Sequence, residues 1–273
     1  MKKRIDLILV NQGLVPSRAK AAAFIKAGHV YVNGELVARA NKLFDEDDIS
    51  IELSQIEAKY VSRGGLKLEK AVTNFAICLK DKVCLDIGAS TGGFTDCMLK
   101  QGALKVYAVD SGQNQLDSLL KNDTRVINIE KLNFRFMQPE DLPEPIYFAA
   151  VDVSFISLKL ILPAAYHILP PGSGMVCLIK PQFEVGIDRV AKNGIIKDKK
   201  AHYQVIKEII DFAEKMGFTI LNLDFSPLRG GKDGNIEYLL HLGKQTSIDA
   251  NVKIDHRATV MKAHEFFKLE RAK

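Results

Sequence analysis

Residues 83–98, VCLDIGASTGGFTDCM, lead from an apolar run through an acid into a glycine-rich turn. A second apolar run then ends at Asp110 in VYAVDSGQNQL. Val83–Leu85 and Val106–Val109 have the length and composition of buried strands, and the residues between them predict a helix. Parallel strands joined in this way place the turn at the carboxyl edge of a sheet, where nucleoside-containing cofactors bind. The stretch therefore predicts an α/β domain with such a cofactor.

The acids and glycines of the turn indicate which cofactor fits. A dinucleotide site spaces three glycines as G-x-G-x-x-G around a pyrophosphate, whereas here Gly88 is followed by Gly92 and Gly93. Asp86 would repel a pyrophosphate, which argues against an oxidoreductase, but it attracts the cationic S-adenosyl-L-methionine. We expect this cofactor to be bound by Asp86, Gly88, Ser90, Gly92 and Asp110, the last at the ribose hydroxyls. The alternative is a purely structural turn, with glycines at positive φ and Asp86 as a helix cap.

The composition is that of an ordinary soluble globular protein. The 273 residues are 47% hydrophobic and 26% charged, and no apolar stretch approaches the roughly 18 residues of a membrane-spanning helix. Four widely spaced cysteines favour buried thiols over a disulfide framework or a metal site. The basic start, MKKRIDLILVNQGL, has too short an apolar run for a signal peptide. We expect a cytoplasmic protein with no metal and no membrane partner.

Positive charge gathers near the N-terminus, within a net charge of +5. The first thirty residues hold a single acid, Asp6, against Lys2, Lys3, Arg4, Arg18, Lys20 and Lys26. Basic side chains on one helix can line up against phosphates, where each contact adds salt-dependent affinity that is independent of sequence. The alternative is solvated charge on an exposed helix face. We expect RNA to be bound by Arg4, Arg18, Lys20 and Lys26, and by Arg63 at the entry to the next domain.

The pattern of residues 1–60 predicts a small α+β module. Apolar spacing predicts helices at 5–12 and 17–27, the second capped by Ser17 and stopped at Gly28. Asn33-Gly34 predicts a type I′ hairpin turn, and residues 48–53 predict a last strand. This order and the string SRAKAAAFIKAGHVYVNGELV resemble the RNA-binding module first seen in small-subunit ribosomal protein four.

Polar residues recur where predicted strands meet the ligand-binding rim. Asp152 follows the strand in FAAVDVSFISL, and Lys180 follows the one in GMVCLIKPQFEVG. Lys67 lies near the start of a helix after Gly64-Gly65, and Glu237 begins the alternation IEYLLHL. An amphipathic helix is predicted at 199–216. Taken singly, each charged residue is more simply explained by a surface ion pair of less than about 1 kcal/mol.

The motifs together resemble one family across nearly the whole chain. SRGGLKLEKA, DIGASTGGFTDCML, VDVSFISL, LIKPQFEVG and GNIEYLLHL are similar to those of the bacterial TlyA family, also called hemolysin A. The resemblance implies a Rossmann-like class I methyltransferase domain of the FtsJ type at 61–245 with a mostly parallel sheet, the RNA-binding module at 1–60, and a helical tail at 246–273. It also implies S-adenosyl-L-methionine as methyl donor and a cytidine ribose of ribosomal RNA as acceptor, with a catalytic set at Lys67, Asp152, Lys180 and Glu237.

A ribose 2′-hydroxyl is a weak nucleophile, so its methylation needs in-line placement and a group that stabilises the developing alkoxide or removes its proton. We expect Lys180 to contact the 2′-hydroxyl. The sequence does not determine which group finally takes the proton. The resemblance implies large-subunit rRNA as the substrate, and the tail through Lys273 favours small-subunit rRNA as a second one. The substrate is either free rRNA or an assembled subunit. The alternatives are a non-catalytic RNA-binding or ribosome-assembly protein and a membrane-active hemolysin.

Overall fold

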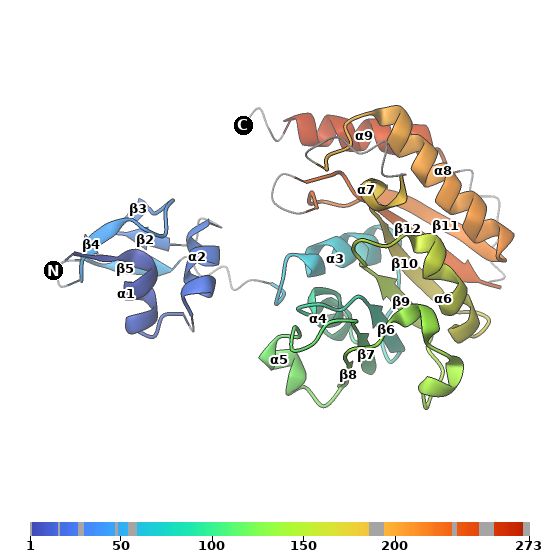
Figure 1. Cartoon of the computed structure of the whole chain (residues 1–273), viewed down its shortest axis with the longest axis horizontal. Coiled ribbons are helices and arrows are strands. Elements are labelled where there is room, and N and C mark those ends of the chain that lie inside the picture. The colour runs from blue at the N-terminus through green and yellow to red at the C-terminus, as the bar shows by residue number, and fades with distance from the viewer. Residues whose placement is uncertain are drawn as a thin grey trace. The chain divides into compact units, whose positions relative to one another are not determined.

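A computed structural model of the chain describes residues 2–15, 17–26, 30–46, 49–53, 59–185, 194–230, 234–245 and 254–269. The chain divides into two compact units, Met1–Lys59 and Tyr60–Lys273 (Figure 1). Each unit has a hydrophobic core of its own. The two units are therefore described one at a time.

The first unit packs two helices against short antiparallel strands. Its elements are β1 (Lys2–Arg4), α1 (Ile5–Asn11), α2 (Arg18–Lys26), β2 (Val30–Val32), β3 (Glu35–Leu36), β4 (Leu43–Asp45) and β5 (Ile51–Leu53). Strand β2 lies between β3 and β5, and β1 pairs with β4. The two predicted helices are confirmed. The sequence did not predict β1 or β4, because strands of three residues show no alternation of their own.

Local chemistry explains how these elements begin and turn. The Ser17 hydroxyl accepts a hydrogen bond from the Lys20 amide at 3.2 Å, so Ser17 caps α2 as predicted. Asn33 and Gly34 have φ of 52° and 79°, the left-handed values that a type I′ hairpin turn requires. The predicted stop at Gly28 lies outside the described residues.

The second unit is built on a seven-stranded sheet in the order β11-β12-β10-β9-β6-β7-β8. The strands are β6 (Val83–Ile87), β7 (Lys105–Val109), β8 (Val126–Ile129), β9 (Phe148–Val151), β10 (Gly174–Ile179), β11 (Phe218–Phe225) and β12 (Tyr238–Lys244). Five neighbours from β10 to β8 run parallel, whereas β12 and β11 are antiparallel to the strands beside them. The predicted α/β class with a mostly parallel sheet is confirmed.

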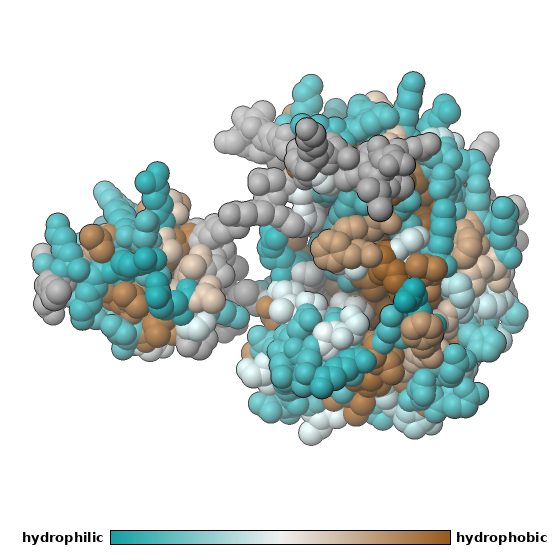
Figure 2. Space-filling model, viewed as in Figure 1, coloured by the Kyte–Doolittle hydropathy of each residue, from teal (hydrophilic) through white to brown (hydrophobic). Residues whose placement is uncertain are grey.

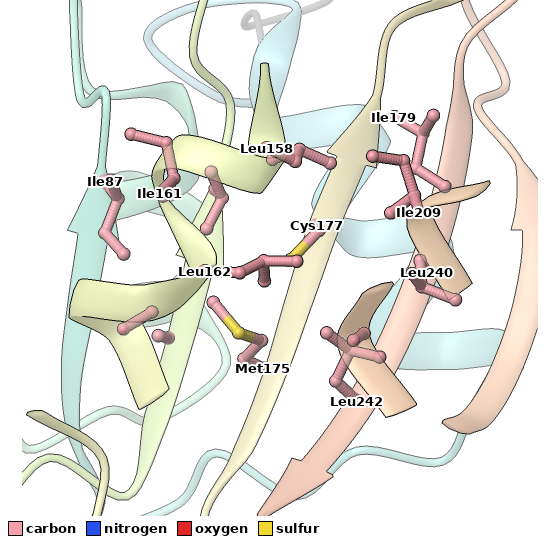
Figure 3. Packing of buried hydrophobic residues seen from close by; sticks show 14 of the residues in the cluster. Ile87, Leu158, Ile161, Leu162, Met175, Cys177, Ile179, Ile209, Leu240 and Leu242 are labelled. Carbon is pink, nitrogen blue, oxygen red and sulfur yellow. The ribbon is translucent and has the colours of Figure 1, made fainter. Parts of the chain in front are cut away.

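Helices cover both faces of this sheet (Figure 1). They are α3 (Gly64–Asn74), α4 (Gly93–Lys100), α5 (Ser118–Lys121), α6 (Leu162–Ile168), α7 (Pro181–Glu184), α8 (Lys199–Lys215) and α9 (His256–Leu269), with short 3-10 turns at Phe134–Phe136, Pro139–Asp141 and Leu158–Leu160. Strand β10 is apolar on both faces because one core lies on each side, and β6 is apolar except for the buried Asp86. Figure 3 shows the core where Leu162 and Ile209, from α6 and α8, meet Cys177 and Leu240 of the sheet.

The antiparallel strand β12 has a direct consequence for the site. Its first residue, Tyr238, pairs with Ile179, the last residue of β10. The residue before an antiparallel strand therefore lies at the same sheet edge as the residues that follow the parallel strands. Glu237 is brought beside Lys180 in this way, although 57 positions, the difference of their residue numbers, separate them in the sequence.

We expect Leu162→Ala to lower the free energy of unfolding by about 2 to 5 kcal/mol, because Leu162 is fully buried and the substitution leaves a cavity. The matched control is Leu119→Ala, since the Leu119 side chain is 73% exposed. Its expected effect is within about 0.5 kcal/mol. Urea unfolding followed by circular dichroism measures both, and equal losses in the two variants would contradict the packing described here.

Candidate active site

The glycine-rich turn after β6 is tied to the end of β7 by one carboxylate. Asp110 accepts hydrogen bonds from the Ser90 amide at 2.8 Å and the Gly112 amide at 2.7 Å, one on each oxygen. Each carboxylate oxygen has a second lone pair, so Asp110 can also accept from a diol such as a ribose. Ser90 has a φ of 48°, a left-handed value that this pairing holds in place.

Gly88 is required because the end of β9 approaches its backbone. A Cβ added to Gly88 would lie 2.8 Å from the backbone oxygen of Asp152, and the φ of Gly88 is +85°. A side chain here would push the turn away from β9. The turn and Asp152 are therefore held together at one point of the sheet edge.

Two of the five predicted cofactor residues lie behind the turn instead of facing a cavity. Asp86 is fully buried, and its Oδ2 accepts a hydrogen bond from the Thr95 hydroxyl at 2.6 Å. Gly92, at φ +92°, makes room for Leu120, whose Cδ1 would lie 2.2 Å from an added Cβ. Gly88, Ser90 and Asp110 do line cavities. Asp86 and Gly92 therefore shape the turn from behind.

Two cavities meet at this edge of the second unit. The first has a volume of about 290 Å³ and includes Arg63, Lys67, Thr91, Phe94, Lys180 and Arg229 in its wall. The second has a volume of about 430 Å³ and includes Asp110, Gln115, Leu132, Asn133, Phe155 and Ile161. Four residues line both, namely Gly88, Ser90, Asp152 and Ser154. A ligand that fills both cavities would pass these four residues at its middle.

The structure brings the four predicted catalytic residues together. Lys180 Nζ lies 2.5 Å from Asp152 Oδ1, and Lys67 Nζ lies 2.7 Å from Glu237 Oε2 and 3.7 Å from Asp152 Oδ2. Asp152 therefore stands between two ammonium groups. Glu237 is 2% exposed and lines neither cavity, so it acts through Lys67 and does not face a ligand.

Burial and the neighbouring charges shift the pKa values of Lys67 and Glu237 in opposite directions. Burial works to lower the pKa of Lys67, but the charges of Asp152 and Glu237 outweigh it, and the pKa lies above its ordinary value. Burial raises the pKa of Glu237, although Lys67 and Lys180 act against that rise. Lys67 therefore stays an ammonium at neutral pH. It serves as a fixed positive charge and not as a base.

Lys180 has a second polar partner that the sequence did not single out. Its Nζ donates a hydrogen bond to the Ser154 hydroxyl at 3.0 Å, and the Phe183 ring lies 5.8 Å away. Lys180 is 7% exposed and lines the first cavity. Asp152 and Ser154 together fix the direction of its ammonium group. Ser154 lies within the motif VDVSFISL, but the motif alone assigns it no role.

Phe155 is the most unusual residue of the site. Its side chain is 90% exposed, and its φ is +63°, which for a residue with a side chain costs on the order of 1 to 3 kcal/mol. Its ring lies 5.0 Å from that of Phe183 and lines the second cavity. In Figure 2 hydrophobic residues gather over the region where α7 and the ends of β9 and β10 lie in Figure 1. Strain and exposure together point to a contact outside the chain.

Arg229 reaches the first cavity from the far side and is braced by the C-terminal helix. Its guanidinium donates to the carbonyls of Gly234 at 3.4 Å and Phe267 at 3.2 Å, and it lies 4.6 Å from the Phe267 ring. Phe267 is in turn buried in the core that α9 shares with α8. Helix α9 therefore supports one wall of the cavity. Arg63, predicted to contact RNA, lines the same cavity.

Two of the predicted RNA-binding residues of the first unit pair with one buried acid. Arg4 donates two hydrogen bonds of 3.0 Å to Asp6, and Arg18 donates two, of 3.1 and 3.4 Å. Burial works to raise the pKa of Asp6, but the hydrogen bonds from Arg4 and Arg18 outweigh it and hold the pKa below its usual value. Both guanidinium groups stay about half exposed. Lys20 is exposed, and the Lys26 side chain lies outside the described residues.

The chain is similar to known proteins along most of its length. Residues 60–244 match the family described as FtsJ-like methyltransferase, and residues 3–50 match the S4 domain. Hemolysin A of Brachyspira hyodysenteriae is 45% identical over 240 residues, covering 87% of this chain and 98% of that protein. The 16S/23S rRNA (cytidine-2'-O)-methyltransferase TlyA of Mycobacterium tuberculosis is 38% identical, covering 90% and 91%. A solved structure named "Putative hemolysin from Streptococcus thermophilus" is similar with a TM-score of 0.80 and 44% identity, covering 100% of this chain and 99% of that one.

None of the helices among the described residues is both long and apolar enough to cross a membrane. No group of three or more His, Cys, Asp or Glu side chains in that part of the chain is arranged to hold a metal ion.

We expect Asp86→Asn to stabilise the protein more at pH 8 than at pH 5. Burial raises the pKa of Asp86 to about 7 in the folded protein, so the folded state holds this proton more tightly than the unfolded state does. The free energy of unfolding therefore falls as the pH rises from the pKa of the unfolded state to about 7. Asparagine has no such titration, so its advantage should grow by roughly 2 to 3 kcal/mol between pH 5 and pH 8. Urea unfolding of both proteins at the two pH values tests this. An advantage that stays constant with pH would show that Asp86 is ionised throughout.

Proposed function

The chain belongs to the FtsJ-like methyltransferase family, and from that premise we propose that it methylates ribosomal RNA with S-adenosyl-L-methionine. The acceptor is the 2′-hydroxyl of a cytidine in large-subunit rRNA, with small-subunit rRNA as a second substrate. The names of the relatives support the acceptor. The observation that carries the proposal is the ammonium of Lys180, fixed by Asp152 and Ser154 beside the junction of two cavities.

The cavity residues fit the proposed cofactor. Asp110 offers two carboxylate oxygens to the ribose, and Asn133 and Leu132 line the same cavity at the end of the next strand, where the adenine would lie. The methionine part would extend past Gly88 and Ser90 into the first cavity. When bound, S-adenosyl-L-methionine supplies an electrophilic methyl group on a sulfonium.

The catalytic work of the chain is to place the hydroxyl and to stabilise the negative charge that develops on its oxygen. Lys180 contacts the 2′-hydroxyl and stabilises the developing alkoxide, while Asp152 and Ser154 hold the ammonium in line. Lys67 keeps Asp152 from turning away and is itself held by Glu237. An ion pair on an open surface would contribute little. Here the pairs are buried, so that each group fixes its neighbour.

Phe155 supplies a surface for an unpaired base. RNA is recognised in single strands by stacking of splayed bases on aromatic side chains, worth about 1 to 3 kcal/mol per base. The exposed Phe155 ring lies 5.0 Å from the Phe183 ring, which in turn lies 5.8 Å from Lys180 Nζ, so a base that stacks on Phe155 can have its ribose near the ammonium. A non-catalytic RNA-binding protein would not need the buried set of lysines and acids. The structure offers no observation that favours a membrane-active protein.

We expect Lys180→Ala to abolish methyl transfer and to leave the affinity for S-adenosyl-L-methionine within about threefold, because Lys180 acts on the acceptor. Tritiated-methyl transfer to large ribosomal subunits from cells that lack the gene measures activity, and calorimetry measures binding. The matched control is Lys70→Ala, since Lys70 is also partly buried and pairs with Asp224 at 3.2 Å but lines neither cavity. An active Lys180→Ala enzyme would overturn the assignment.

We expect Lys20→Ala to weaken RNA binding equally for all sequences. It should also reduce the slope of log affinity against log salt by about 1, which is the loss of one phosphate contact. Lys20 suits this test because its exposed side chain has no described role in the fold of the first unit. Filter binding at several salt concentrations gives the slope. An unchanged slope would remove Lys20 from the RNA contact.

A further inference from the structure

Glu184 ends α7, one turn of helix after Lys180, and binds the loop that follows β9. Its carboxylate accepts a hydrogen bond from the Ser157 hydroxyl at 2.5 Å and another from the Leu158 amide at 2.8 Å. Glu184 lines neither of the two cavities. Its contacts therefore concern the loop itself and not a ligand.

The same loop is held a second time, at its other end. Lys180 donates to Ser154 at 3.0 Å and pairs with Asp152 at 2.5 Å. Lys180 and Glu184 belong to one rigid segment, since Pro181 starts α7 and the Phe183 amide donates to the Lys180 carbonyl at 2.9 Å. The residues between Ser154 and Ser157 are thus fixed between two anchors from one element.

The segment between the anchors contains the strained residue of the site. Phe155 has its φ of +63° there, with its side chain exposed over the second cavity. A non-glycine residue keeps such a conformation only where the surroundings impose it. The hydrogen bonds on either side of Phe155 impose this conformation. Those made by Glu184 come from a residue outside the predicted catalytic set.

We propose that Glu184 is a positioning residue for methyl transfer, which holds the loop after β9 so that Phe155 and Ser154 face the cavities. This inference rests on the proposed function, because the loop positions an RNA base and the Lys180 ammonium. Without the two hydrogen bonds, Phe155 is free to leave the left-handed region, and its ring then moves away from the site. Phe155 lines the second cavity as Asp110 does, but Asp110 keeps its own hydrogen bonds from the Ser90 and Gly112 amides, so the contacts proposed for the cofactor ribose are unchanged.

The test compares three variants in transfer to large ribosomal subunits from cells that lack the gene. Glu184→Ala should lower kcat/KM by about tenfold or more, with the affinity for S-adenosyl-L-methionine within about twofold. Glu184→Gln should stay within about threefold of wild type, because its amide can accept from Leu158 and pair with Ser157. Glu208→Ala is the matched control, since Glu208 binds Lys159, next to Leu158, from the outside. It should leave activity unchanged.

A role in stability alone is separated by a double-mutant cycle with Phe155→Ala. If Glu184 acts through the position of Phe155, then Glu184→Ala should cost less than about threefold in the Phe155→Ala background. An equal loss in both backgrounds, or full activity of Glu184→Ala, would overturn the proposal. A thermal melt shows whether each variant is folded. If Glu184→Ala is not folded, Glu184→Gln still tests the proposal.

Failure of this inference and failure of the proposed function give different results. If wild type transfers methyl groups and Lys180→Ala does not, the function holds whatever Glu184→Ala does. If wild type itself transfers none, the proposed function fails before the Glu184 variants are compared.

Discussion

The ion pair between Asp152 and Lys180 joins the ends of two neighbouring parallel strands, and the site depends on it. Asp152 contacts three parts of the site at once. Its carboxylate meets Lys180 and Lys67, its amide donates to the Ile87 carbonyl at 3.0 Å, and its carbonyl lies against Gly88. One residue therefore fixes the distance between the cofactor turn and the catalytic ammonium. Methyl transfer is sensitive to that distance, because reacting atoms must be brought into line.

Burial makes the charged set interdependent. Two lysines and two acids balance in charge, and Lys180 and Glu237 are almost fully buried. Removing one member of such a pair leaves an uncompensated charge, which typically costs about 3 to 5 kcal/mol. Substituting Glu237, which lines neither cavity, should therefore disturb Lys67 first and Asp152 through it. This is why a residue that never touches the substrate can still look catalytic in a simple activity assay.

The sequence predicts most of this site because its residues follow strands. Asp110, Asp152 and Lys180 each come after a parallel strand, and such positions converge at one sheet edge whatever the intervening loops do. The roles of Asp86 and Gly92 in cofactor binding stay predictions, since a motif shows spacing but not which side chains face the cavity.

Residues outside the rim pattern could not be predicted. Phe155 is unusual for its φ and its exposure, and neither is encoded in a local pattern. Glu184 binds a loop 26 to 27 residues earlier, and only the packed structure shows that contact. The strands β1 and β4 were missed because their pairing is likewise non-local. The division into three parts at 60 and 245 stays a prediction, and the described residues of the last part place α9 in the core of the second unit.

In the proposed function, the first unit contributes affinity for RNA and the second unit contributes selectivity. Asp6 holds Arg4 and Arg18 in fixed positions, so their guanidinium groups lose less freedom when they meet phosphates. Such contacts strengthen binding to any RNA and select no nucleotide. Selection must then come from a site whose shape admits only an unpaired base with its ribose. In the proposed function, the exposed ring of Phe155 provides a surface on which an unpaired base stacks, so this contact adds to binding and favours single-stranded over paired RNA.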